Sequence, residues 1–233
     1  MIDRDVFSSD AYVDHFKPDH AFNPFHAIYA EKRADILDSV RNTLAPGGKI
    51  LDLGGGMGRM SVPLAREYRV TLCDLSAEML RLAAGAAAES EVPAGNLTTR
   101  HLNAADPLPF PDHSFDRVLS IDLLVHLPDP ISTLRELRRV LTPDGEILVD
   151  MSNSSPWWLL RYPGYVGKRP ARWVRTWRGG GVLPEWQSIV RHCSRSEFHD
   201  MLRGAGIIPI QEWSYGPAWC PKWDLARCRP HVS

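Results

Sequence analysis

A glycine-rich segment, Gly54–Gly58, constrains this chain of 233 residues more than any other feature. It follows the apolar run Ile50–Leu53, and amphipathic sequence comes after it. This order is typical of a strand that turns through a glycine loop into a helix. Glycines at such a turn permit positive φ angles and let a ligand contact the backbone directly. The sequence therefore predicts a ligand site at this turn.

The spacing of these glycines separates two classes of ligand. A dinucleotide fingerprint requires glycine at the first, third and sixth positions, but the sixth position from Gly54 is Arg59. Glycine stands instead at the first, third and fifth positions, Gly54, Gly56 and Gly58. The spacing argues against a nicotinamide dinucleotide.

The charge at Asp52, directly before the loop, gives an independent argument. Its carboxylate would repel a pyrophosphate, whereas it would attract the sulfonium and ammonium groups of S-adenosylmethionine (SAM). The alternative is that Asp52 only accepts hydrogen bonds from loop amides. Such a role would not exclude contact with the ligand.

Apolar runs alternate with amphipathic segments over residues 1–150, which predicts a parallel sheet with helices on both faces. We expect strands at Lys49–Leu53, Arg69–Asp74, Leu97–Asn103, Arg117–Ile121, Glu146–Met151, Ile207–Ser214 and Lys222–Cys228. We expect helices at Pro24–Leu44, Met57–Tyr68, Ser76–Ser90, Pro130–Leu141 and Ser194–Arg203, with a turn at Thr142–Gly145. Ser76 and the Asp129–Pro130 pair are favourable helix starts.

The second predicted strand ends in Asp74, 20 residues after Gly54. A carboxylate at this place can accept hydrogen bonds from both ribose hydroxyls of a nucleotide. Capping of the next helix is the alternative role, but Ser76 is better placed for it. Met79 lies one helical turn beyond Leu75, so the two side chains could flank an adenine; core packing explains Met79 equally well.

The composition lowers the prospect of several partners. A net charge of −1 gives no field that favours DNA or an anionic membrane. No apolar stretch approaches the ~18 residues of a membrane helix, and the first residues do not resemble a secretory signal. The four cysteines form no C-x-x-C pair and lack histidines at zinc spacing. We expect a cytoplasmic protein with reduced thiols and no metal site, as a monomer or homodimer.

Several ordered motifs carry a resemblance to a known family. They are Leu51–Gly58, Cys73–Leu80, Leu108–Phe110 with Ser114–Asp116, His126–Pro130 and Arg139–Gly145. With these motifs the chain resembles the class I SAM-dependent methyltransferases, in particular the small-molecule "type 11" branch that includes quinone-biosynthesis enzymes. The resemblance covers residues 45–152 strongly and Ser194–Ser214 moderately. It implies a Rossmann-like α/β fold with a seven-stranded, mostly parallel sheet and an antiparallel last strand.

The resemblance also implies the contacts of SAM and of its product S-adenosylhomocysteine (SAH). The methionine part would lie against Gly54–Gly58, the ribose on Asp74, and the adenine beside Leu75, Met79 and the turn after the third strand. The cofactor-binding residues would be Asp52, Leu53, Gly54, Gly56, Gly58, Asp74, Leu75, Met79, Asn103, Ala104, Ala105 and Ser120. The family usually has an acid where Ala104 stands, so Asp106 or a backbone carbonyl would have to hold the adenine amino group.

The segment after the fourth predicted strand offers titratable groups. Ser120 and Asp122 should lie at the carboxyl edge of the sheet, where ligands of open α/β sheets bind. Asp122 and His126 are the candidate catalytic residues, with His126 as a general base for an acceptor that must lose a proton. A structural role is the alternative for His126. The segment is not the Asn/Asp-Pro-Pro-Tyr element expected of enzymes that methylate DNA amino groups or glutamine amides.

Residues 153–193 are rich in Trp, Tyr and Arg, and no acid occurs from Ser152 to Pro184. We interpret this segment as an inserted lid over a flat, sugar-bearing or anionic acceptor, which stacking and cation contacts would hold. The candidate acceptor contacts are Trp157, Trp158, Tyr162, Tyr165 and Trp173. Docking to a lipid-linked acceptor, an RNA surface or a solvated basic face are the alternatives.

We therefore expect one domain over residues 1–233. It would comprise a helical cover (1–44), a SAM-binding core (45–152), the lid (153–193), and a C-terminal helix and strands (194–233). The expected function is in-line methyl transfer from SAM to an oxygen, nitrogen or carbon of a small molecule, for example a secondary metabolite. A SAM-binding protein without catalysis, a nicotinamide oxidoreductase and an RNA methyltransferase are the alternatives.

Overall fold

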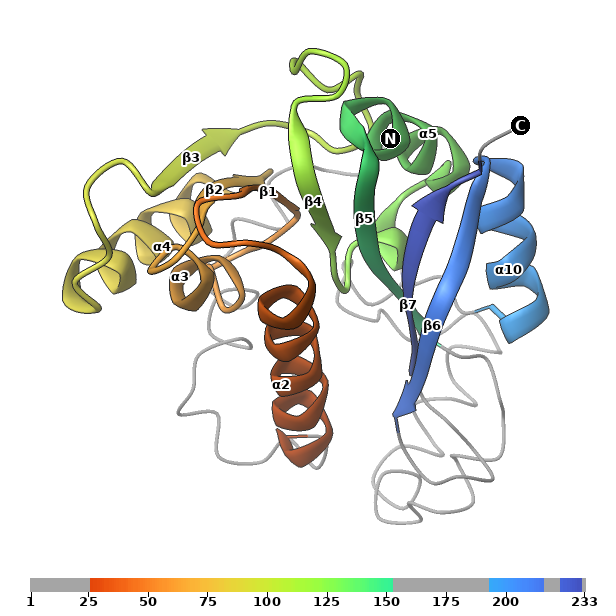
Figure 1. Ribbon diagram of the computed structural model, residues 1–233, viewed down its shortest axis with the longest axis horizontal. Coiled ribbons are helices and arrows are strands. Elements are labelled where there is room, and N and C mark those ends of the chain that lie inside the picture. The colour runs from red at the N-terminus through yellow and green to blue at the C-terminus, as the bar shows by residue number, and fades with distance from the viewer. Residues whose placement is uncertain (1–25, 153–192, 216–222, 232–233) are drawn as a thin grey trace, which may run out of the picture.

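The computed structural model describes residues 26–152, 193–215 and 223–231 of the chain. Its centre is a seven-stranded sheet in the order β3-β2-β1-β4-β5-β7-β6 (Figure 1). The strands are β1 (Lys49–Leu53), β2 (Arg69–Asp74), β3 (Leu97–His101), β4 (Phe115–Ser120), β5 (Leu141–Ser152), β6 (Ile207–Tyr215) and β7 (Trp223–Pro230). β7 runs antiparallel to both β5 and β6, and the other pairs are parallel. The predicted fold class is confirmed.

The helices cover both faces of this sheet. They are α2 (His26–Thr43), α3 (Ser61–Leu64), α4 (Ala77–Glu89), the 3-10 turn η2 (Leu124–His126), α5 (Pro130–Val140) and α10 (Arg195–Gly204). One buried cluster joins α2 and α3 to Ile50, Leu119 and Leu148, and a small one joins α4 to Leu72. The opposite face packs α5 and α10 against Leu51 among others. In Figure 1, α3 and α4 lie at the β1–β3 end of the sheet and α10 lies beside β6.

The helix starts follow from short polar side chains. Ser76 accepts a hydrogen bond from the amide of Met79, and Asp129 accepts one from the amide of Ser132 at the start of α5. Ser194 and Glu197 form a reciprocal capping box at the start of α10. These side chains satisfy amides that have no partner within the helix, so the predicted starts are confirmed.

Two predicted elements differ from the structure. The helix expected over Met57–Tyr68 is reduced to α3, because Gly58 adopts a φ of +78° that an α-helix cannot contain. The turn expected at Thr142–Gly145 lies inside β5, where it forms an irregularity. Phe115 pairs with Leu141, and the next pairing joins Arg117 to Glu146. The extra residues are absorbed as a bulge, not as a separate turn.

The topology defines one edge where a ligand site can form. The strand order reverses between β1 and β4, so the chain leaves these neighbouring strands toward opposite sides. Open α/β sheets bind their ligands in the crevice at the carboxyl ends of such strands. Among the described residues no helix has the length and apolarity that crossing a membrane requires.

Candidate functional site

The glycine loop at the end of β1 adopts the backbone conformation that its spacing predicts. Gly54, Gly56 and Gly58 have φ angles of +75°, +54° and +78°, which side chains rarely tolerate. The amides of Gly54 and Gly55 both donate to the carbonyl of Cys73 on β2, at 2.8 and 3.2 Å. A Cβ at Gly56 would meet no atom within 4 Å, so its backbone borders open space. The loop is fixed on one side and accessible on the other.

Asp52 lies buried under this loop. Its carboxylate accepts a hydrogen bond from the hydroxyl of Ser61 at 2.6 Å, and a Cβ on Gly55 would come within 2.5 Å of its Oδ2. Burial raises the pKa of Asp52 to about 6, although the bond from Ser61 opposes that shift. The carboxylate is therefore largely ionised at pH 7 and close enough to neutrality to respond to a cationic ligand.

Asp74 connects the glycine loop to the start of α4. It accepts hydrogen bonds from the amide of Gly56 at 2.9 Å and from that of Ser76 at 2.8 Å. Burial raises the pKa of Asp74, and these amides oppose the shift. Ser76 caps α4 itself, as expected. The amide of Leu75 also donates to Asp74, so three of the roughly four acceptor sites of the carboxylate are used and one remains for a ligand donor.

The predicted adenine region lies beyond β2 and β3. Leu75 is half-buried, whereas Met79 is 3% exposed on the buried side of α4. In the turn after β3, the side chain of Asn103 accepts from the amide of Ala105, and the carbonyl of Ala104 accepts from the hydroxyl of Thr133. Because that carbonyl is already engaged, another group, such as the exposed Asp106, suits an adenine amino group better.

Ser120, at the end of β4, carries a buried polar atom that has no partner among the residues described. Its hydroxyl oxygen is buried and accepts or donates no hydrogen bond among the residues that the structure describes. Buried hydroxyls normally find a partner in protein, water or ligand. Because Ser120 lies at the carboxyl edge of the sheet, a bound molecule could supply the hydrogen-bond partner of its hydroxyl.

Asp122 follows β4 in an unusual backbone conformation, with a φ of +58°. Its carboxylate accepts from the ammonium of Lys32 at 2.8 Å, and its amide donates to Asp150 at 2.6 Å. Lys32 also contacts Asp150 at 2.6 Å. Asp122 has 41% of its side chain exposed, while Lys32 and Asp150 are buried. The three side chains form a polar cluster at the carboxyl ends of β4 and β5.

Sequence reasoning missed Lys32 and Asp150. Lys32 belongs to α2 and shares its buried stripe with Ile36 and Val40, four and eight residues later. Asp150 interrupts the apolar run that begins at Ile147 in β5. A charge at a core position of each element was the available signal, because buried charges must be paired. Burial lowers the pKa of Lys32, but the two carboxylates outweigh it and raise the value above normal.

Tyr29 also contacts this cluster, and its ring centroid lies 5.3 Å from the ammonium of Lys32. Burial, together with the charge of Asp122, raises the pKa of Tyr29 far above its usual value. The phenol therefore stays neutral. It adds a cation–π contact that helps to hold the buried lysine.

His126 lies in η2, four residues beyond Asp122. Burial lowers the pKa of His126, and the negative charge of Asp122 opposes this effect only in part. The imidazole is therefore neutral at pH 7, the form that a general base requires.

Leu123 lies against the glycine loop, since a Cβ on Gly54 would be 2.8 Å from its Cδ1. Segment 122–126 thus borders the loop.

The predicted acceptor contacts lie outside the described residues. They are Trp157, Trp158, Tyr162, Tyr165 and Trp173. Within the described ranges there is no group of three His, Cys, Asp or Glu side chains that could hold a metal ion.

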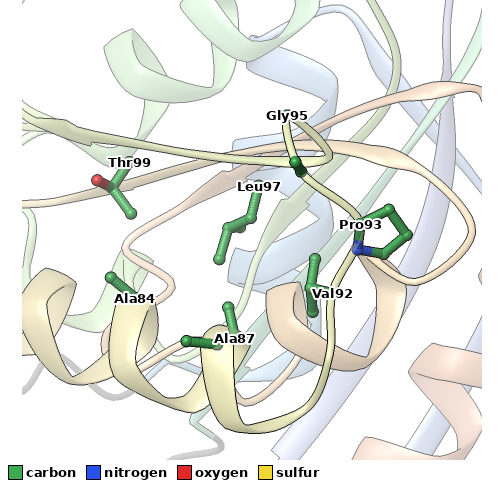
Figure 2. A pocket seen from close by; sticks show the side chains of 9 residues that line it. Ala84, Ala87, Val92, Pro93, Gly95, Leu97 and Thr99 are labelled. Carbon is green, nitrogen blue, oxygen red and sulfur yellow. The ribbon is translucent and has the colours of Figure 1, made fainter.

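An apolar hollow of about 210 Å³ lies elsewhere, between α4 and β3 (Figure 2). Ala84 and Ala87 face Leu97 across it, and Val92 and Pro93 lie at one end. It contains none of the residues at the carboxyl edge and carries no charged side chain. We therefore do not assign it to the candidate site.

Comparison with known proteins identifies the family. Residues 51–149 match the model of a family described as a methyltransferase domain, and this region includes the glycine loop, Asp74 and the Asp122 segment. This region belongs to the class I SAM-dependent methyltransferases. SAM is the cofactor of this family, and the accessible loop, buried Asp52 and unpartnered Ser120 hydroxyl fit a cationic ligand.

Curated proteins with sequences similar to this chain include two that are named ubiquinone biosynthesis O-methyltransferases. A ubiquinone biosynthesis O-methyltransferase of Xanthomonas oryzae is 32% identical over 141 residues, 60% of this chain and 54% of that protein. One from Cereibacter sphaeroides is 28% identical over 204 residues, covering 84% and 75%. The chain spans about half the length of the first of these relatives.

Solved structures share the methyltransferase fold at lower identity. The magnesium protoporphyrin IX methyltransferase of Synechocystis PCC 6803, crystallised with SAH, has a TM-score of 0.74 at 16% identity and covers 97% of both chains. The [4+2]-cyclase SpnF has a TM-score of 0.64 at 20% identity and covers 88% of this chain and 82% of its own. At these identities the likeness shows the fold alone.

Proposed function

We propose that the protein transfers the methyl group of SAM to a small-molecule acceptor. The observation that carries this proposal is the glycine loop, which has three left-handed glycines and contacts two acids, Asp52 beneath it and Asp74 beside it. Acids at both places suit a ligand with a cationic centre and a ribose. The family match over residues 51–149 supports the same conclusion.

Each part of the cofactor has candidate partners. The backbone of Gly54–Gly58 and the carboxylate of Asp52 would hold the methionine part, and Asp74 would accept the ribose hydroxyls. Leu75, Met79 and the turn of Asn103, Ala104 and Ala105 would border the adenine, with Leu53 and Ser120 completing the floor. When bound, SAM supplies a methyl group already activated by a sulfonium.

The protein must then align the acceptor, exclude water and remove a proton where needed. The acceptor atom forms its bond to the methyl carbon as the carbon–sulfur bond breaks, which leaves SAH. His126 is a better candidate base than Asp122, because burial lowers the pKa of His126 and keeps its imidazole neutral, whereas the Asp122 carboxylate is bound to the ammonium of Lys32. The proton of a hydroxyl acceptor would pass to His126.

The acceptor that we propose is a hydroxyl on a flat, ring-bearing molecule. The names of the curated relatives, O-methyltransferases of ubiquinone synthesis, favour oxygen as the methylated atom. The aromatic and basic composition of residues 153–193 suits stacking on a ring and attraction of an anionic substituent. Together with residues 1–44, this segment would cover the cleft of a single domain.

A panel assay with the whole chain tests the proposal. Purified protein would be incubated with SAM carrying a labelled methyl group and with phenols, catechols, amines and thiols, and labelled product and SAH would be measured. We expect transfer to one or more ring hydroxyls. If the protein bound SAM but formed no SAH with any of the acceptors, the proposal would be contradicted.

A second function has specific support. The similar structure of SpnF is named a [4+2]-cyclase, so this fold can serve a reaction other than methyl transfer. The alternative for this chain is a protein that binds SAM without consuming it. The stoichiometric formation of SAH with methylated product separates the two functions.

A further inference from the structure

The burial of the Lys32 ammonium carries a large desolvation cost. Its side chain is 1% exposed, on the buried stripe of α2 that otherwise carries Ile36 and Val40. An ammonium without water is tolerated only when it is paired and hydrogen-bonded. Asp122 and Asp150 provide the pairing, from positions 90 and 118 residues further along the chain. The cluster therefore joins three distant elements.

The cluster holds a strained piece of backbone. Asp122 is a non-glycine residue at a φ of +58°, a conformation that persists only when its surroundings fix it. Both of its polar ends are fixed here. The carboxylate is bonded to Lys32, and the amide is bonded to the same Asp150 side chain that Lys32 contacts.

The next residue carries this constraint to the glycine loop. Leu123 lies so close to Gly54 that a Cβ added there would be 2.8 Å from its Cδ1 and 3.1 Å from its Cβ. A change in the Asp122 backbone would therefore move Leu123 relative to Gly54. Gly54 is the first glycine of the loop that borders the cofactor site.

We propose that Lys32 is a positioning residue of the SAM site. Acting through Asp122 and Asp150, it holds the Asp122–Leu123 turn against Gly54 and thereby sets the wall of the site. The proposal deepens the cofactor assignment and does not depend on which acceptor is methylated.

SAH affinity measured by calorimetry tests the proposal. Lys32→Met keeps an unbranched side chain that is one atom shorter and removes its charge, and we expect the Kd for SAH to rise at least tenfold. Val40→Ala is the matched control, because it removes buried atoms from the same stripe of α2 without touching Asp122. It should lower the Tm while leaving the Kd within twofold. An unchanged Kd in a folded Lys32→Met protein would overturn the proposal.

A double-mutant cycle shows whether Lys32 acts through Asp122. Asn tolerates left-handed backbone, so Asp122→Asn removes the charge without adding strain. We expect Asp122→Asn alone to raise the Kd about tenfold, and the double variant to bind SAH no more weakly than Lys32→Met. Additive losses would mean that each residue acts separately, which contradicts the proposal.

If Lys32→Met does not fold, Asp122→Asn still tests the proposal. A Kd for SAH within twofold of wild type in Asp122→Asn would show that the cluster does not position the SAM site. The acceptor panel can fail without affecting these measurements, because SAH binding needs no acceptor. Absence of SAH binding by the wild-type protein would instead overturn the cofactor site itself.

Discussion

The amide of Gly56 donates a hydrogen bond to the carboxylate of Asp74 at 2.9 Å, so the acid proposed to hold the ribose also fixes the glycine loop. Two parts of the site are thereby coupled. A change at Asp74 acts on the ribose contact and on the loop that borders the methionine part. The two residues are 18 positions apart, and the sequence between them does not indicate this hydrogen bond.

Asp74→Ala should therefore weaken SAH binding by about 10- to 100-fold, as expected for the loss of charge-assisted hydrogen bonds worth ~1.5–3 kcal/mol. Calorimetry with SAH measures the effect. Asp144→Ala removes an exposed acid from β5 and serves as the control. Equal affinity of the Asp74→Ala protein and the control would refute the ribose assignment.

Gly56→Ala should impair ligand binding more than folding. Gly56 and Gly47 both have positive φ angles, and a Cβ on either would meet no atom within 4 Å. Each substitution should cost about 1–2 kcal/mol of unfolding free energy from backbone strain alone. Only Gly56→Ala should also raise the Kd for SAH, because its Cβ would enter the open side of the loop. Similar SAH affinities in both variants would show that the ligand does not border Gly56.

Asp52 should make stability fall as the pH rises through the weakly acidic range. Its pKa is raised from 3.8 to about 6, so the folded state keeps a proton that the unfolded state has lost between about pH 4 and 6. The stabilisation from this proton is complete below the pKa of Asp52 in the unfolded state and vanishes above its pKa in the folded state. Relative to Asp52→Asn, wild type should lose about 1.4 kcal/mol between pH 5 and 7.5 in urea unfolding.

The same titration should affect SAM more than SAH, because only SAM carries the sulfonium charge. The ratio of SAM to SAH affinity should rise from pH 5 to 7.5 as Asp52 ionises. In Asp52→Asn this ratio should stay flat. A ratio that varies equally in both proteins would assign the effect to another group.

His126→Ala should lower turnover about 10²- to 10⁴-fold for a hydroxyl acceptor, the usual contribution of a positioned base. Its SAH affinity should change little. Because burial lowers the pKa of His126, the acidic limb of kcat/KM should lie below pH 6.5 in the wild type. Unchanged turnover in the variant would leave His126 with a structural role only.

Glu146 should matter for stability and not for the cofactor. It pairs with Arg117, Arg227 and Arg229 at the amino ends of β4 and β5, opposite the glycine loop. Glu146→Ala leaves the buried Arg117 without its carboxylate, which should cost roughly 3–5 kcal/mol. Thermal unfolding measures the loss, and the SAH affinity of the folded protein should remain unchanged. A stability near that of wild type would show that water solvates these arginines.

The elements that the sequence predicted well are those decided by neighbouring residues. The bounds of β1 and β2, the cap at Ser76 and the left-handed glycines follow from apolar runs and backbone sterics within a few positions. Lys32 and Asp150 could not be assigned in this way. Their core positions in the sequence indicate that each charge needs a partner, but only packing of α2 across the ends of β4 and β5 identifies that partner. The helix expected after the loop was too long for a related reason, since Gly58 extends the loop conformation into its first turn.

The position of β7 between β5 and β6 has a consequence for how the sheet assembles. In the described part of the chain β6 pairs only with β7, so it joins the rest of the sheet only through the pairing of β7 with β5. The β5–β7 pairing joins residues that lie far apart in the sequence, for example Ser152 and Trp223, and this slows its formation. Until β7 has paired, the edge of β5 that β7 covers is open. β5 is a strand of 12 residues, most of which are buried in the folded protein. Loss or delay of β7 should therefore lead to aggregation by strand pairing between chains.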